Sequence, residues 1–451
     1  MRRMLLAGVL LVAAAGQAQT PQPGPVQVQL TPPSASLGQN NSTQFNASRG
    51  FIGGSGKPGA SKNINACVKW TSSDQNIVSV DNTGLATGMN LGTAMITANC
   101  GPFHGSALVT VHGAQCGNGI REAGEQCDDG NNTNLDGCSA TCTFEQDQRM
   151  NSITMKFNTD ATCSKNALGG AIGSLAQSPL QTLISNGVGL GSINSLFAML
   201  GISDLSGTTQ PSFQIGVLGG TAVAGSGYNG ASDLDWWYTP DPSSINVNRV
   251  PVNQLSASIA ASALSAGPGS LTFPPVFGGA GELQFSNTMI KATVGASSTP
   301  LASSGTPPGH VAAENLDPAL TSYGSMTGGS VCGGVSAASL AATPVPAALA
   351  QGGATACTQG YSTINNSLLD VFVGGCTVFV ISAIAPTQPD TVDPNAPAAG
   401  AGGPYVLAEN ASHQVSSCKD KSGTPVSLSA CLNAAAYSSY FAFTTDRVII
   451  K

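Results

Sequence analysis

The segment Ser232–Tyr238, with the sequence SDLDWWY, concentrates side chains whose chemistry suits sugar binding. It contains two of the three tryptophans of the chain and a tyrosine, next to two aspartates. Aromatic faces stack on the apolar faces of sugar rings, and carboxylates accept hydrogen bonds from hydroxyl groups. We therefore predict a ligand-binding site made of Asp233, Asp235, Trp236, Trp237 and Tyr238. The alternative is packing, because side chains alternate between the faces of a strand and one tryptophan would then enter the core.

Oxygen-bearing side chains gather a second time in the segment 128–136, with the sequence DDGNNTNLD. A hard cation such as calcium prefers oxygen ligands of this kind. The candidate calcium ligands are Asp128, Asp129, Asn131, Asn134 and Asp136. The spacing is not that of an EF-hand, and its closing glutamate is missing. We predict no cofactor other than calcium, and the alternative is that these residues only form turns between cysteines.

Motifs of the common catalytic centres are missing from the sequence. The four histidines stand apart without an H-E-x-x-H pattern, and neither G-x-S-x-G nor a phosphate-binding G-x-x-x-x-G-K-[ST] occurs. Glycoside hydrolysis needs only two facing carboxylates, so composition does not exclude it. The candidate acids are Asp233, Asp235, Glu282, Glu314, Asp317 and Asp370. We predict a non-catalytic protein, with an exported glycan-active hydrolase as the alternative.

The chain has few charged residues, and this composition argues against a nucleic-acid partner. Of 451 residues, 16 are Lys or Arg and 23 are Asp or Glu, which gives 9% charged residues and a net charge of -7. A protein that neutralises nucleic-acid phosphates needs a basic surface, so we predict no nucleic-acid partner. The low charge suits an extracellular partner, either a polysaccharide or a surface protein.

The N-terminus has the pattern of a secretory signal peptide. Arg2 and Arg3 precede an apolar stretch, and small residues near Ala18 form the predicted cleavage site, so we assign residues 1–18 to the signal peptide. No later segment has the length and apolar character of a membrane span. We predict export to the extracellular space or the outer cell surface.

Twelve cysteines lie in the mature chain, an even number that predicts six disulfides in an oxidising compartment. They are Cys67, Cys100, Cys116, Cys127, Cys138, Cys142, Cys163, Cys332, Cys357, Cys376, Cys418 and Cys431. Full pairing would leave no thiolate for nucleophilic catalysis. Zinc is disfavoured because none of the histidines lies within a few residues of a cysteine pair.

Residues 26–112 alternate with the period of a half-buried strand, as in Val28 and Leu30 or Val109 and Val111, and we assign residues 24–113 to one domain. The segment WTSSDQNIVSVDNTGLATGMNLGTAMITA, from Trp70 onward, resembles the bacterial Ig-like domain of group 2. The resemblance implies a β-sandwich that acts mostly as a spacer in surface and adhesion proteins. We expect Cys67 and Cys100 to bridge two strands across its core.

Residues 114–145 carry four cysteines spaced C-x10-C-x10-C-x3-C, with glycines beside them. So short a segment has almost no apolar core, and crosslinks must replace it. The sequence CGNGIREAGEQCDDGNNTNLDGCSATC resembles the Myxococcus cysteine-rich repeat, a module of secreted proteins. Three cysteine pairings remain open.

Residues 150–451 form the largest region. Leucines and isoleucines from Leu168 to Leu200 recur at helical spacing, with interruptions at glycines and Pro179. Strand-like stretches follow, among them SFQIGVLGG, ELQFS, LDVFV, CTVFVIS and YFAFTTDRVII. We predict a large β-sandwich or jelly-roll-like domain with a short helical preface, and Cys418 with Cys431 as one disulfide. The region resembles a C-terminal module of uncharacterised myxobacterial secreted proteins.

The sequence therefore predicts a mainly β chain with an Ig-like sandwich, a small disulfide-rich module and a larger β domain. The predicted function is a secreted or cell-surface adhesion protein that recognises carbohydrate, matrix or a surface protein. Two alternatives stay open, the exported hydrolase and a structural subunit of a surface layer, because β-sandwiches host all three roles.

Overall fold

The computed structural model describes residues 27–50, 62–204, 206–223, 237–273, 282–296 and 324–450. The predicted signal peptide lies outside these residues. The chain forms two compact units. One extends to Gln115 and includes Glu122–Gly124, and the other comprises Cys116–Arg121 and everything from Glu125 onward. The cysteine-rich segment thus belongs largely to the C-terminal unit.

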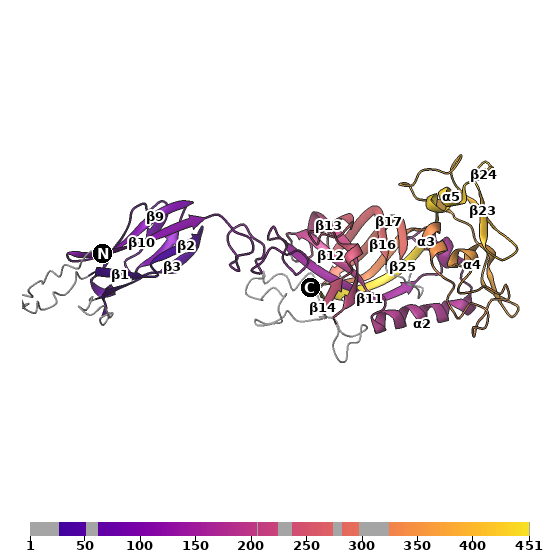
Figure 1. Ribbon diagram of the computed structural model, residues 1–451, viewed down its shortest axis with the longest axis horizontal. Coiled ribbons are helices and arrows are strands. Elements are labelled where there is room, and N and C mark those ends of the chain that lie inside the picture. Colours follow the sequence, from indigo (N-terminus) through magenta and orange to yellow (C-terminus); the bar gives the residue numbers. More distant parts are fainter. Residues whose placement is uncertain are drawn as a thin grey trace, which may run out of the picture. The chain divides into compact units, whose positions relative to one another are not determined.

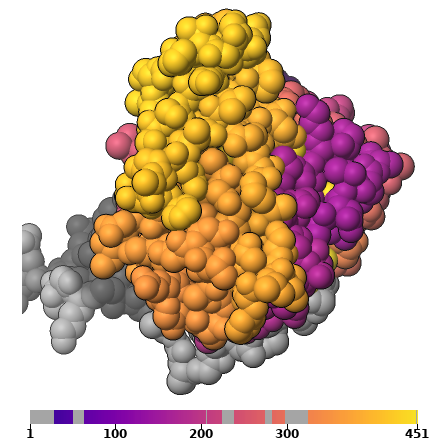
Figure 2. Space-filling view, turned by 90° about the vertical axis from the view of Figure 1, so that its right-hand side faces the viewer, coloured from indigo at the N-terminus to yellow at the C-terminus, as the bar shows by residue number. Residues whose placement is uncertain are grey.

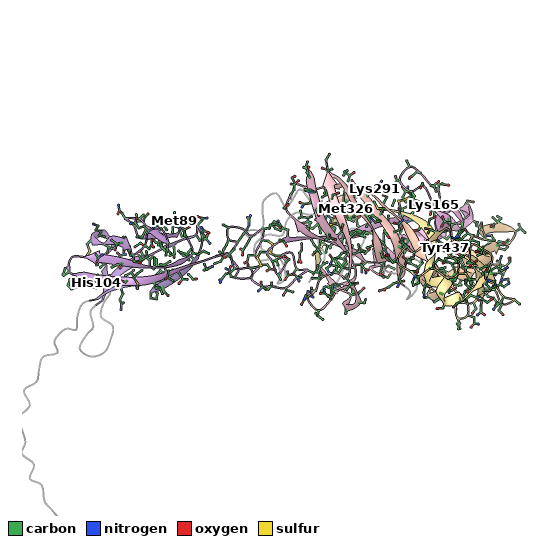
Figure 3. All side chains as sticks on the ribbon, turned by 90° about the horizontal axis from the view of Figure 1, so that it is seen from above. Met89, His104, Lys165, Lys291, Met326 and Tyr437 are labelled. Carbon is green, nitrogen blue, oxygen red and sulfur yellow. A yellow bond between two sulfur atoms is a disulfide. The ribbon has the colours of Figure 1, made fainter. Side chains whose placement is uncertain are left out.

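The N-terminal unit is built from short strands in three sheets. The first sheet has the order β1 (Gln27–Thr31), β4 (Asn46–Gly50), β5 (Lys62–Asn63). The second has the order β2 (Ser34–Gly38), β10 (Phe103–His112), β9 (Gly92–Cys100), β6 (Lys69–Ser72). The third has the order β3 (Ser42–Gln44), β8 (Leu85–Gly88), β7 (Val78–Val80). Met89 and His104 mark opposite ends of this unit (Figure 3).

Alternating side chains of these strands form the core of the N-terminal unit, as the period-two pattern predicts. Val28, Leu30 and Val109 are buried, and the rings of Phe45 and Trp70 lie 6.5 Å apart. The predicted Cys67–Cys100 disulfide is present, but its predicted position was wrong. Cys67 lies in the short 3-10 helix Asn65–Cys67 and is exposed, so the bridge fastens the end of β9 to a surface turn and does not cross the core.

The C-terminal unit is organised around a sheet that closes on itself. Its eight antiparallel strands follow the order β12 (Ser195–Ile202), β11 (Phe144–Met155), β25 (Ala435–Arg447), β18 (Ser325–Ser336), β17 (Leu283–Gly295), β16 (Ala263–Phe273), β15 (Asn253–Ala260), β13 (Thr209–Ala222). Pairing of β12 with β13 completes the circle (Figure 1). The prediction of a large β domain is confirmed, and its single closed sheet leaves these strands without a free edge.

Aromatic and aliphatic side chains of these strands form one continuous core. Phe285 packs edge-to-face against Phe273 at 4.9 Å and against Phe441 at 6.0 Å between ring centroids. Phe197 lies 5.7 Å from Phe443. A second, separate cluster of buried side chains includes Leu196 of β12 and Leu218 of β13. It joins them to Tyr238 and to Leu135 of the cysteine-rich segment.

The smaller strands and helices lie at the periphery of the closed sheet. They are α1 (Ala167–Gly170), α2 (Ser174–Leu190), β14 (Trp237–Pro240), the 3-10 helix Pro242–Ser244, α3 (Ala337–Ala342), α4 (Leu368–Gly374), β19 (Cys376–Val378), β20 (Ile381–Ile384), β21 (Thr391–Val392), β22 (Val406–Glu409), β23 (Val415–Lys419), β24 (Pro425–Val426), α5 (Leu428–Ala434) and β26 (Ile449–Ile450). Helix α2 lies along β11, and α3, α4 and α5 gather near the far end of the sheet (Figure 1).

Three local predictions were wrong. The helical pattern ends at Leu190, and Leu196 and Leu200 lie on β12, because Gly191 in the left-handed conformation (φ 72°) terminates α2. The stretch LDVFV is not a strand but helix α4. Ser367 and Asp370 form a capping box at its N-terminus, and nearly all of its side chains are buried, which erases any alternation. Pro179 does not break α2.

Six disulfides crosslink the described residues, and none of the twelve cysteines is free. The pairs are Cys67–Cys100, Cys116–Cys142, Cys127–Cys138, Cys163–Cys332, Cys357–Cys376 and Cys418–Cys431. The predicted Cys418–Cys431 pair is confirmed. Among the described residues, no helix combines the length and apolar character needed to cross a membrane.

Candidate functional site

The predicted carbohydrate site divides between described and undescribed residues. Asp233, Asp235 and Trp236 lie outside the described part of the chain, and the side chain of Trp237 on β14 is not described either. Tyr238 is fully buried beside the Arg149 guanidinium, which lies 5.6 Å from its ring centroid. The prediction that Tyr238 contacts ligand was therefore wrong. Strand alternation turns this side chain into the cluster around Leu135, as the packing alternative predicted.

The tip of the β19–β20 hairpin exposes three consecutive large apolar side chains. Phe379 is 84% exposed, Val380 92% and Ile381 52%. Phe379 also has a φ of 56°, in the left-handed region that a bulky L residue rarely adopts. Isolated exposed apolar residues are ordinary, but three together on a strained turn indicate an interaction surface. We call these three residues the apolar tip.

The hairpin that carries the apolar tip is fastened firmly at its base. The Cys357–Cys376 disulfide ties its first strand to the preceding loop. On the second strand, Ala383 O accepts a 2.8 Å hydrogen bond from Gly173 N, and directly after this strand Ala385 N donates a 2.7 Å bond to Ala171 O. These bonds join the hairpin to the junction between α1 and α2. The tip is thus presented by a rigid base.

An apolar groove begins where the hairpin meets α2. Its volume is about 460 Å³, and its walls include Leu175, Leu180 and Leu183 of α2 and Phe372 of α4. Val378 and Ile384 line it from the hairpin, so groove and apolar tip are continuous along one pair of strands. No charged side chain lines the groove among the described residues. Figure 2 shows this end of the unit, with the orange and yellow segments next to the magenta segment that contains α2.

A smaller hollow of about 200 Å³ brings two carboxylates to one wall of the closed sheet. Asp241 and Glu282 both line it, together with Ser243 and Ser244. Burial raises the pKa of the Asp241 carboxyl. Glu282 was among the predicted candidate acids, whereas Asp241 was not, because nothing in the sequence pairs it with another acid. Glu314 and Asp317 lie outside the described residues.

Asp370, another candidate acid, has a structural role. Its Oδ2 accepts hydrogen bonds from Ser367 N at 2.7 Å and Ser367 Oγ at 3.0 Å, and its Oδ1 accepts one from Val415 N at 2.6 Å. The residue is 5% exposed. It holds α4 against β23 and is not poised for acid catalysis.

The predicted calcium ligands separate into two groups. Asp128 is fully buried and accepts backbone N–H bonds from Gly117, Asn118, Gly119 and Gly130 at 2.7–3.2 Å. Its carboxylate therefore folds the loop around it, as the turn-forming alternative predicted.

The two asparagines also accept backbone bonds. Asn131 Oδ1 accepts a 2.6 Å bond from Thr133 N, and Asn134 Oδ1 accepts a 2.8 Å bond from Ala140 N. Asn134 Nδ2 donates to Asn248 O at 2.6 Å. Both amides form the turns of the cysteine-rich segment.

The remaining two, half-buried Asp129 and buried Asp136, belong to a group of acids that the sequence did not reveal. Asp136 is 7% exposed, and its Oδ2 accepts a 3.2 Å bond from Asn131 Nδ2. Glu145 and Asp147, on β11, are 5% and 4% exposed. Glu145 Oε2 accepts bonds from Leu135 N at 2.5 Å and Asp136 N at 3.4 Å. We call Asp129, Asp136, Glu145 and Asp147 the acidic group.

Burial dominates the electrostatics of the acidic group. It raises the pKa of Asp136 to about 7, and the neighbouring Asp129 charge raises this pKa further. It likewise raises the pKa of Glu145 to about 8, with the Asp136 charge contributing. The pKa of Asp147 is raised well above its usual value by burial and by Glu145, while Arg249 opposes the shift. A desolvated carboxylate needs a compensating charge or a proton.

Comparison with known proteins identifies the N-terminal unit. Residues 26–111 match the family model of the bacterial Ig-like domain (group 2), so the predicted Ig-like domain is confirmed. Ice-binding protein 1 of Shewanella frigidimarina (strain NCIMB 400) is 32% identical over 87 residues, which cover 19% of this chain and 9% of that protein. The chain thus spans about a tenth of the length of this relative. Residues 26–111 are thus similar to the bacterial Ig-like domain (group 2), and the match does not cover the C-terminal unit.

Proposed function

We propose that the protein is an exported, non-catalytic adhesion protein whose C-terminal unit binds a protein on a cell surface. The single observation that carries this proposal is the apolar tip, Phe379–Ile381, continuous with the apolar groove. Fully burying a side chain such as Phe or Val contributes about 1.5–3 kcal/mol. When a partner covers the tip, the burial of these side chains stabilises the complex by this free energy.

The chemistry of the groove favours a protein as the partner. Its described lining is uncharged and largely aliphatic, and about 460 Å³ accommodates several side chains. Such a surface offers little to the hydroxyl groups of a sugar, whereas it matches apolar side chains presented by another protein. The fastened hairpin reduces the entropy lost on binding, because the tip needs no ordering.

The rest of the chain supports a role at the cell surface. Ig-like domains of this group serve mostly as spacers, and the family match places one before the C-terminal unit. Six disulfides suit an oxidising compartment, in agreement with the predicted signal peptide of residues 1–18. The resemblance of residues 114–145 to the Myxococcus cysteine-rich repeat points the same way.

Binding of the labelled full-length mature chain to intact cells of the source organism tests the proposal. We expect Phe379→Ser with Val380→Ser to reduce binding at least about tenfold, since each lost apolar contact costs more than 1.4 kcal/mol. Val247→Ser is the matched control, because Val247 is 99% exposed in the same unit but lies outside the tip and groove. Equal binding by the double variant and the control would refute the proposal. Self-association of the chain without cells would instead favour a structural subunit of a surface layer.

A second function, glycan hydrolysis, is favoured by one observation, the hollow shared by Asp241 and Glu282. The raised pKa of Asp241 suits a general acid, and Glu282 is the second carboxyl group that such a reaction needs. Incubation of the chain with extracellular polysaccharides, followed by a reducing-end assay, tests it. Turnover that disappears in Asp241→Asn would establish this function, and no turnover by the unmodified chain would dismiss it.

A further inference from the structure

The acidic group lies where the cysteine-rich segment meets the closed sheet. Asp129 and Asp136 come from the segment, and Glu145 and Asp147 come from the same face of β11, because residues two apart on a strand point the same way. Leu135, next to Asp136, is fully buried against Leu196 and Leu218 of the sheet. This packing places Asp136 near β11 and buries its carboxylate.

Two carboxylate oxygens of the group are buried without a hydrogen-bond donor. They are Oδ1 of Asp136, whose side chain is more than nine-tenths buried, and Oδ1 of Asp147, which is buried to the same degree. The Asp129 carboxyl also acts on Asp136 and raises its pKa, and an ionised carboxyl is an acceptor only. A buried acceptor that faces another acceptor costs several kcal/mol unless a positive charge or proton lies between them.

Most of the charges that raise or lower the pKa values of this group are negative. Arg249 lowers the pKa of Asp147, but its guanidinium donates to Asn134 O at 2.8 Å and to Leu135 O at 3.3 Å. The charges that act on Asp136 and Glu145 are those of other carboxylates.

From this arrangement we propose that Asp129 and Asp136 bind one calcium ion, with Glu145 and Asp147 as the surrounding negative charge. Calcium accepts six to eight oxygen ligands in flexible geometry, so carboxylates from a loop suit it better than magnesium, which demands a rigid octahedron. Asn131 holds Asp136 in place through its 3.2 Å bond to Oδ2, which leaves Oδ1 for the ion. The remaining ligands are backbone carbonyls and water. The positive charge of the ion, next to Glu145 and Asp147, stabilises the contact between the disulfide-bonded segment and β11.

Another trio of residues in the segment does not compete for this role. Glu125, Asp128 and Cys142 bring one ligand atom each within 4.8 Å of one another. The sulfur of Cys142 is bonded to Cys116, and both oxygens of Asp128 accept backbone N–H bonds. Neither atom is available to an ion.

Calorimetric titration of the chelator-treated full-length mature chain with calcium chloride tests the proposal. We expect one site with a dissociation constant of about 10⁻⁴ to 10⁻³ M, as in other extracellular modules, and a melting temperature that rises by at least about 2 °C at saturation. Asp136→Asn should abolish both responses. Asp393→Asn, the same substitution in a half-buried loop residue of the same unit, should retain both.

Two results would overturn the proposal. One is the absence of heat and of any change in melting temperature up to about 10 mM calcium, which exceeds the weakest expected dissociation constant; the carboxyls then share protons instead. The other is equal responses of Asp136→Asn and Asp393→Asn. If Asp136→Asn does not fold, Asp129→Asn, at a half-exposed position, replaces it with the same expected loss.

Discussion

The cysteine-rich segment buries carboxylates, whereas the β19–β20 hairpin of the same unit exposes large apolar side chains. Asp136 and Glu145 are 7% and 5% exposed, while Phe379 and Val380 are 84% and 92% exposed. Each arrangement costs free energy in the protein alone, because charge prefers water and apolar surface avoids it. The two regions would therefore be stabilised by different ligands. A cation would stabilise the buried carboxylates, and an apolar partner surface would cover the exposed side chains.

Among the substitutions that distinguish the two regions, one at Leu135 should have the largest effect on the free energy of unfolding. We expect Leu135→Ala to lower the free energy of unfolding by about 2–5 kcal/mol, because its side chain is fully buried between the segment and the sheet. Calcium binding should weaken in the same variant, since the segment no longer packs firmly against β11. Urea denaturation measures the first effect, and calorimetric titration measures the second.

Ile364→Ala provides the matched comparison for Leu135. Ile364 is 89% exposed in the same unit, so its truncation should change the free energy of unfolding by less than about 0.5 kcal/mol. Equal losses in the two variants would contradict the packing described for the cysteine-rich segment.

A smaller effect should follow from Arg249→Met, which keeps the aliphatic stem and removes the charge. The carbonyls of Asn134 and Leu135 lose their donors, so we expect a loss of about 1–3 kcal/mol in the free energy of unfolding. The loss should be greater in chelator than in calcium, because the ion supplies the only other positive charge that we place beside Asp147. A loss of the same size in both conditions would argue against the ion. Thermal denaturation in the two buffers makes the measurement.

A still smaller effect than that of Arg249→Met should come from Phe379→Gly, and it should be a gain in the free energy of unfolding. Glycine adopts a φ of 56° without the strain of an L side chain, which outweighs its entropic cost by up to about 1 kcal/mol. Binding to cells should fall in the same variant, because the exposed ring is gone. A stabilised protein with undiminished binding would show that the ring serves neither folding nor adhesion. Chemical denaturation and cell binding are measured on the same preparation.

Much of the architecture follows from the sequence because its signals are local. The alternation around Val28 and Val109 specifies half-buried strands, and the motif from Trp70 onward identifies the Ig-like domain. The short separation of Cys418 and Cys431 made their pairing predictable. The closure of the C-terminal sheet was not predictable, because pairing of β12 with β13 depends on the register of all eight strands.

The candidate sites were predicted less well, for two physical reasons. The apolar tip lies within the uninterrupted stretch CTVFVIS, whose turn at Phe379 contains neither glycine nor asparagine, so it has no turn signal. The acidic group combines Asp129 and Asp136, which the sequence did indicate, with Glu145 and Asp147. The latter two lie beyond the last cysteine of the segment, and they reach it only because Leu135 packs on the closed sheet.

Treatment of the cells before binding tests the central claim most directly, because it asks whether the partner is a protein. The half-saturating concentration of the labelled chain is measured on untreated, protease-treated and periodate-treated cells. A protein partner predicts at least about a tenfold rise after protease and no change after periodate. Binding that survives protease but disappears after periodate would contradict the claim and assign the adhesion to a carbohydrate.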